Sequence, residues 1–168
     1  RKEIRWWLVI GLVIFSLRSS LADWSDVPTG SMKPTILEGD RIFVNRVAYD
    51  LKVPFTTWHL LEWADPQRGD VVVLYSPADE KRLVKRVIGV PGDEIELRDN
   101  KLFVNGEPAE YGPLSPDVQN EIPLDQQPDH EFATERVGDQ SHPVMTTPDR
   151  WSPSSFGLVT VPAGNYFM

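Results

Sequence analysis

Several stretches of the chain carry hydrophobic residues with a period of two, which predicts β-strands. Residues 41–47 and 70–75 are rich in β-branched and aromatic side chains, as strands usually are. Two similar stretches, 94–97 and 101–104, are separated by Arg-Asp-Asn at 98–100, and this arrangement predicts a hairpin. We therefore expect a mostly β fold.

Turn signals lie between these strands. Gly-Asp steps at 39–40, 69–70 and 92–93 each lead into an apolar stretch, and Asn-Gly follows at 105–106. Glycine and asparagine tolerate the backbone conformations that tight turns need. The steps therefore mark the boundaries of the predicted strands.

The N-terminal part differs from the rest. Residues 6–17 form an apolar run, and Arg18 beyond it is long enough to reach the lipid headgroups. The run is bracketed by the tryptophans Trp6, Trp7 and Trp24, which are typical of membrane interfaces. We expect a short transmembrane helix over residues 7–22. A secretory signal peptide or a buried core helix is an alternative, although no small-x-small cleavage site follows before residue 31.

Charges on either side of this run predict its orientation. Basic residues precede it and acidic residues follow it: Arg1, Lys2, Arg5, Asp23 and Asp26. Because basic flanks stay in the cytoplasm, everything after residue 23 is expected on the extracytoplasmic side.

The segment from 107 to 162 is rich in proline and acidic residues and has little periodicity. It reads either as a disordered linker or as a loop-rich β insertion. We favour the insertion, because Trp151, Phe156 and residues 158–161 look like buried material, and because 166–168 read as a return to the main sheet. The expected divisions are a cytoplasmic flank with a transmembrane helix, a catalytic β domain, the insertion and a return strand, at 1–23, 24–106, 107–160 and 161–168.

Composition narrows the function classes. A net charge of -8 disfavours nucleic acid as a partner. The chain has no cysteine, so disulfides, thiol nucleophiles and cysteine-based metal sites are excluded. At 168 residues the chain can support one medium-sized core.

Two residues are candidates for nucleophilic catalysis. The first, Ser31, lies between Gly30, which permits unusual backbone geometry, and Pro34, which restricts the backbone beside it. Such a loop can expose the hydroxyl and aim backbone N–H groups at an oxyanion, and Thr29 is close enough to add a donor. A serine needs a base, and a lysine serves only when it is neutral. Taken alone, this loop is an ordinary turn.

Lys85 is the candidate base. On an extended strand over 82–90 it shares a face with Leu83 and Val87, so its neighbours are apolar. The alternative is that Lys85 reaches solvent beside Arg86.

Four ordered blocks combine these features: PTGSMKPTI at 28–36, GDRIFVNR at 39–46, RGDVVV at 68–73 and KRVIGVPGD at 85–93. In this order, behind an apolar run, they closely resemble bacterial type I signal peptidase, a family of serine-lysine dyad proteases. VPAGNYFM at 161–168 is similar to a late strand of the family.

The resemblance implies roles for individual residues. Ser31 matches the nucleophile, Lys85 the general base, and Thr29 the oxyanion donor that works with the Ser31 N–H. Substrate would lie as an extended strand between 23–31 and 82–85, in the manner of β-augmentation. Positions that match shallow pockets for small residues are Pro28, Met32, Ile36, Ile42, Leu83 and Val84.

The implied function is a membrane-bound serine endopeptidase that removes signal peptides from exported preproteins by cutting after small residues. It would need no cofactor and no metal. Its expected location is the bacterial inner membrane, with signal peptides, the bilayer and the protein-export machinery as partners. The family's final Gly-Asp-Asn-Arg-Asp-Asn block would follow Met168. We therefore expect the chain to be a piece of a longer protein, with little activity if it ended there.

Other interpretations remain open. His59, His130 and His142 invite a Ser-His-Asp triad, although none lies in an ordering motif and His142-Pro143 reads as a loop. His130 with its acidic neighbours 129 and 131 could hold a metal. The chain could also be a self-cleaving Ser-Lys regulator, or an inactive membrane-anchored β scaffold. Apolar residues around Trp58 and Trp63 suggest either core packing or contact with the membrane interface.

Overall fold

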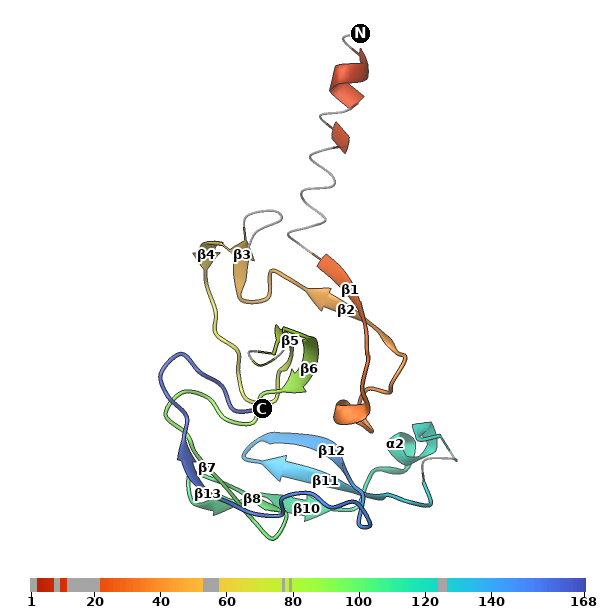
Figure 1. Cartoon of the computed structure of the whole chain (residues 1–168), viewed down its shortest axis with the longest axis vertical. Helices are drawn as coiled ribbons and strands as arrows, with labels where there is room; N and C mark the ends of the chain where they lie inside the picture. Colours follow the sequence, from red (N-terminus) through yellow and green to blue (C-terminus); the bar gives the residue numbers. More distant parts are fainter. Residues whose placement is uncertain are drawn as a thin grey trace. The chain divides into compact units, whose positions relative to one another are not determined.

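The computed structural model describes residues 3–7, 10–11, 22–52, 58–76, 78, 80–123 and 127–168 (Figure 1). Nearly all of the regular structure in these ranges is β-strand, which confirms the mostly β fold class. The strands belong to two compact units: residues 1–27 with 39–66, and residues 28–38 with 67–168.

The first unit contains two antiparallel strand pairs. β1 (Ala22–Asp26) pairs with β2 (Arg41–Asn45), and β3 (Asp50–Lys52) pairs with β4 (His59–Glu62). Trp24 and Phe43 lie directly opposite each other in the first pair, with ring centroids 5.3 Å apart in an edge-to-face arrangement. Such cross-strand aromatic pairs stabilise a small sheet.

Apolar side chains of the β4 region are exposed. Trp58 is 73% exposed and Trp63 53% exposed, and Leu60 and Leu61 between them are exposed as well. Core packing is therefore the wrong explanation for these residues.

The second unit is built from hairpins. β5 (Val71–Tyr75) pairs with β6 (Arg82–Arg86), and the short 3₁₀ turn η1 (Gly30–Met32) lies beside β6. A four-stranded sheet has the order β13-β7-β8-β9. Its strands are β7 (Glu94–Arg98), β8 (Lys101–Val104), β9 (Glu107–Pro108) and β13 (Phe156–Thr160).

The expected turns are present. Gly39, Gly69 and Gly92 of the Gly-Asp steps all have positive φ, at 91°, 94° and 91°, a conformation that glycine adopts at little cost. Asp99 and Asn100 both have positive φ in the β7–β8 hairpin, as its two-residue turn requires. The predicted hairpin is confirmed.

The core of the second unit consists of Ile95, Leu102, Val104, Val137 and Val161. Ile95 is fully buried on β7, and Val137 comes from a different sheet. Each such side chain contributes roughly 1.5–3 kcal/mol on burial. The shared core therefore joins the sheet of the 107–160 segment to the β7–β8 hairpin.

The 107–160 segment contains more regular structure than we expected. β10 (Glu110–Gly112), β11 (Glu131–Val137) and β12 (Gln140–Thr146) form an antiparallel sheet, and α2 (Pro116–Glu121) precedes β11. His142-Pro143, predicted as a loop, lies within β12. β12 is an edge strand, where the missing proline N–H is tolerated.

The expectation of burial in this segment was only partly right. Phe156 packs against the core and Val161 belongs to it, but Trp151 is 90% exposed and Leu158 is also exposed. Residues 157–160 of β13 are all exposed, so neither face of this stretch is buried, and the pairing of β13 with β7 shifts register between Phe156 and Val159.

Residues 3–7 and 10–11 are helical. Within the part of the chain that the structure describes, no helix is both long and apolar enough to cross a bilayer. Much of the predicted span, residues 8–9 and 12–21, lies outside the described residues.

Candidate active site

Ser31 lies in the middle of η1, and its side chain is exposed. The neighbouring Met32 is buried, and its carbonyl accepts a hydrogen bond from the Ile36 N–H at 3.0 Å. The Lys33 N–H closes the turn on the Gly30 carbonyl at 3.1 Å. Anchored by Met32, the turn thus presents the Ser31 hydroxyl to solvent.

Thr29 occupies the N-cap position of η1 in an extended conformation, with φ −144° and ψ 152°. Its side chain is exposed and makes no capping hydrogen bond. The first N–H groups of any helical turn lack partners within that turn. The Thr29 hydroxyl and the Ser31 N–H are thus two donors at the same short turn.

Lys85 lies on β6 and is half-buried. Its cross-strand partner on β5 is Val72, and directly opposite residues share a face of the ladder. Alternation along the strand places Leu83 and the fully buried Val87 on that face. The residues that share a face with Lys85 on this strand pair are therefore apolar.

The structure brings the two candidate elements together. η1 lies beside β6 within the second unit, with Cα atoms of the two elements within 8 Å of one another. The proposed pocket residues of this unit comprise the exposed Pro28, the buried Met32 and Val84, and the half-buried Ile36 and Leu83. Ile42 lies on β2 in the first unit.

Arg86, next to Lys85, bonds to the segment that carries Ser31. Its Nη2 donates to Thr35 Oγ1 at 3.4 Å and its Nη1 donates to the Gly69 carbonyl at 2.8 Å. Burial lowers the pKa of this guanidinium from its ordinary value. Arg86 therefore links β6, which carries Lys85, to the segment after η1 and to the turn before β5.

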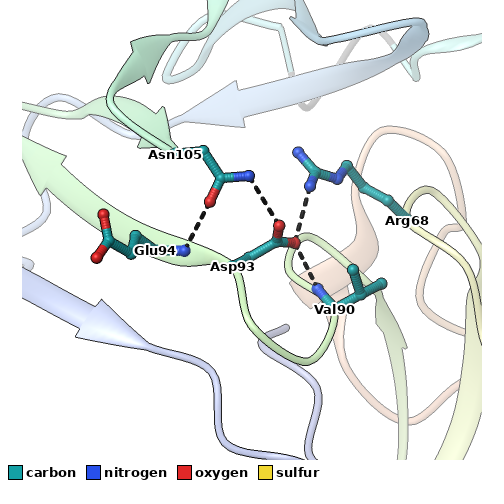
Figure 2. Close-up of polar contacts among 5 residues, drawn as sticks. All are labelled: Arg68, Val90, Asp93, Glu94 and Asn105. Atoms are coloured by element: carbon teal, nitrogen blue, oxygen red, sulfur yellow. Dashed lines mark hydrogen bonds and ion pairs between the residues drawn. The ribbon is translucent and has the colours of Figure 1, made fainter.

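Asp93 organises the loop that follows β6 (Figure 2). It accepts hydrogen bonds from Arg68 at 2.8 Å, from the Val90 N–H at 2.7 Å and from the Asn105 amide at 2.8 Å. Asn105 in turn accepts from the Glu94 N–H at 2.8 Å. Burial raises the pKa of Asp93, but these bonds and the Arg68 charge outweigh it, so that its pKa lies below the ordinary value.

Sequence reasoning missed this network and the bonds of Arg86. In the sequence, Gly92-Asp93 indicates a turn and belongs to the fourth block of the resemblance, but neither feature assigns partners to the Asp93 carboxylate. Its partners Arg68 and Asn105 are distant in sequence, and only the fold brings them to Asp93.

A second polar cluster lies within the β10–β11–β12 sheet. Tyr111 donates to Glu135 at 3.0 Å and accepts from the Leu102 N–H at 3.2 Å, and His142 Nε2 lies 3.7 Å from Glu135. Burial raises the pKa of Tyr111 to about 12 and also raises that of Glu135. Burial, with help from the charge of Arg86, lowers the pKa of His142 to about 4.

The histidine alternatives find no support in these contacts. His142 is engaged with Glu135, and His130 Nδ1 lies 2.9 Å from the Thr147 hydroxyl. The side chain of His59 lies outside the described residues. Across the described ranges, no group of three or more histidine, cysteine, aspartate or glutamate side chains could hold a metal ion.

Comparison with known proteins shows which family the chain is similar to. The family model described as signal peptidase, peptidase S26, matches residues 1–168. Signal peptidase I of Pseudomonas fluorescens is 36% identical over 160 residues, covering 93% of this chain and 54% of the relative. Signal peptidase I of Pseudomonas aeruginosa is 34% identical over the same shares. Signal peptidase I P of Bacillus subtilis subsp. natto is 38% identical over 59% of this chain and 47% of the relative.

The chain spans about half the length of the Pseudomonas relatives that it matches. The family match extends over both compact units, including η1 and β6. On the strength of that match, the chain belongs to the signal peptidase family, peptidase S26.

Proposed function

We propose that this chain is the catalytic part of a membrane-bound serine endopeptidase that removes signal peptides from exported preproteins, with Ser31 as nucleophile and Lys85 as general base. The observation that carries the proposal is the packing of η1 beside β6. An exposed hydroxyl and a lysine with apolar neighbours then belong to adjacent elements of one unit.

The proposed reaction proceeds in two stages. Neutral Lys85 takes the proton of the Ser31 hydroxyl while Oγ attacks the scissile carbonyl carbon. The resulting ammonium gives that proton to the leaving amine as the peptide bond breaks, and an acyl-enzyme remains. Lys85 next takes a proton from water, whose oxygen attacks the ester, and that proton returns to Ser31 as the acyl group leaves.

Thr29 and the Ser31 N–H are proposed to stabilise the oxyanion. Both donors belong to η1 and its N-cap. Donors that are already oriented need no rearrangement when negative charge develops, which is why such groups lower the barrier.

We propose that the substrate binds as an added strand. Within the described residues, β6 pairs only with β5, so that its second edge offers backbone groups to an extended peptide. Within the second unit, the side chains proposed for the small-residue pockets are those of Pro28, Met32, Ile36, Leu83 and Val84.

Membrane attachment is part of the proposal. The apolar run at 6–17 and the basic residues before it support one membrane pass within this chain, with the catalytic part outside the cytoplasm. Signal peptides, the bilayer and the protein-export machinery are the proposed partners, and the inner membrane is the proposed location.

Preprotein cleavage by the full-length protein and its variants tests the proposal. Ser31→Ala and Lys85→Met are each expected to lower kcat at least about a thousandfold while substrate still binds. Ser152→Ala and Lys101→Met are matched controls, because both side chains are exposed, and they are expected to keep full activity. Undiminished cleavage by Ser31→Ala would refute the nucleophile, and a wild-type protein that binds preproteins without cutting them would be a scaffold.

A further inference from the structure

Lys33, two residues after Ser31, folds back over Gly30. A Cβ added to Gly30 would lie 2.8 Å from Lys33 Cε, 3.1 Å from Cδ and 3.4 Å from Nζ. The lysine stem thus occupies the space that a side chain at position 30 would need.

The geometry of the turn holds the Lys33 amine close to the nucleophile. The Lys33 N–H is bonded to the Gly30 carbonyl at 3.1 Å, and the side chain is half-buried. Because adjacent Cα atoms are about 3.8 Å apart, Nζ lies within roughly 9 Å of the Ser31 Cα.

The charge of Lys33 is not neutralised nearby. Among the described residues, no carboxylate forms an ion pair with it. Its field therefore acts on the Gly30–Ser31 peptide, whose N–H is the proposed oxyanion donor.

We propose that Lys33 is an electrostatic residue of the active site, whose ammonium stabilises the developing oxyanion. The inference rests on the proposed function, since it assigns a role only if Ser31 is the nucleophile. Its physical cause is a positive charge held beside η1. An ammonium within roughly 9 Å of the Ser31 Cα attracts the negative charge that develops there.

Kinetics on a fluorogenic peptide with an Ala-x-Ala cleavage sequence test the charge. Lys33→Met keeps the length of the stem and removes the charge. It is expected to lower kcat roughly tenfold with little change in KM. Lys33→Arg should restore most of the lost kcat, and Lys101→Met should leave kcat unchanged. A Lys33→Met enzyme with wild-type kcat would overturn the proposal.

A double-mutant cycle tests the fold-back geometry. Gly30→Ala is expected to displace the Lys33 stem and to lower kcat about as much as Lys33→Met. In a Lys33→Ala background the same change should cost little, because the space is then empty. Equal effects of Gly30→Ala in both backgrounds would contradict the packing.

Thermal unfolding distinguishes a structural role of Lys33 from an electrostatic one, and the Ser31→Ala variant tests the proposed function separately. If Gly30→Ala and Lys33→Ala are coupled in their effects on Tm but leave kcat unchanged, Lys33 has a structural role only, and the proposal is overturned. If Ser31→Ala cleaves the peptide normally, the proposed function itself fails. If Ser31→Ala is inactive while Lys33→Met is normal, only the role of Lys33 fails.

Discussion

The Thr29 hydroxyl is exposed and does not cap the turn that begins after it. A threonine at an N-cap usually bonds to the backbone of its own helix. The Thr29 hydroxyl makes no such bond, and it lies at the same short turn as the Ser31 N–H. For this reason we propose that both groups donate hydrogen bonds to the oxyanion.

Replacing Thr29 by valine removes the donor and keeps the shape of the side chain. We expect kcat to fall about a hundredfold, because loss of one oxyanion donor costs about that much, while KM stays within about twofold. Thr29→Ser should retain most of the activity. Steady-state kinetics at saturating peptide decide the matter, and equal rates for Thr29→Val and the wild type would count against the assignment.

Candidate reactive residues are easier to propose from the sequence than the residues that support them. Ser31 and Lys85 lie in ordered blocks whose residue types indicate their chemistry. The roles of Arg86 and Asp93 depend on partners such as Thr35 and Arg68, which only folding brings near. Long-range hydrogen bonds leave no local pattern, so no reading of neighbouring residues could reveal them.

β11 and β12 join a histidine and a glutamate inside the second unit. Glu135 and His142 are cross-strand partners whose side chains are only 9% and 10% exposed. The remaining ionisable groups that face them are Tyr111 and Arg86. Burial favours the neutral form of His142, so the hairpin is expected to be sensitive to acid.

The sign of this sensitivity follows from the direction of the shift. The pKa of His142 falls from 6.5 to about 4 on folding, so its contribution to stability is complete above about pH 6.5 and is lost as pH falls toward about 4. The loss is up to about 3 kcal/mol. Glu135 has a raised pKa and acts in the opposite direction, but it is present both in the wild type and in a His142→Gln variant.

Urea unfolding between pH 7 and pH 4 measures the effect. Between pH 7 and pH 4, the free energy of unfolding should decrease more for the wild-type protein than for His142→Gln. This holds even if the two proteins already differ in stability at pH 7. His130→Gln serves as the histidine control and should follow the wild-type curve. Parallel curves for the wild type and His142→Gln would contradict a buried neutral histidine.

The β7–β8 hairpin was predictable and the β10–β11–β12 sheet was not. The hairpin is encoded locally, by alternating strands around two residues with positive φ, Asp99 and Asn100. β10 is separated from its partner β11 by α2, and β12 contains a proline that a sequence reading takes as a loop. Pairing across such a gap depends on the shared core.

At the scale of the whole molecule, an exposed apolar surface lies on the first unit, around β4. Trp58, Leu60, Leu61 and Trp63 are all exposed there. Exposed aromatic clusters of this kind are typical of surfaces that meet a membrane interface or another protein. We propose the bilayer, because the N-terminal run is expected to anchor the same chain.

Quenching by brominated lipids tests this contact. The difference in fluorescence between the wild type and Trp58→Phe gives the emission of Trp58. The difference for Trp151→Phe gives the emission of another exposed tryptophan as the control. In vesicles brominated near the headgroups, the emission of Trp58 should be strongly quenched and that of Trp151 much less. Equal, weak quenching of both would remove the membrane contact from the account.

The most direct measurement is the location of the acyl group during turnover. The full-length protein is mixed with a signal-peptide substrate, quenched with acid within the first turnover and analysed by peptide mass spectrometry. The account predicts that the amino-terminal substrate fragment is esterified to Ser31, that the adduct is absent in Ser31→Ala, and that it forms far more slowly in Lys85→Met. Cleavage without any adduct on Ser31, or an adduct on another residue, would contradict it.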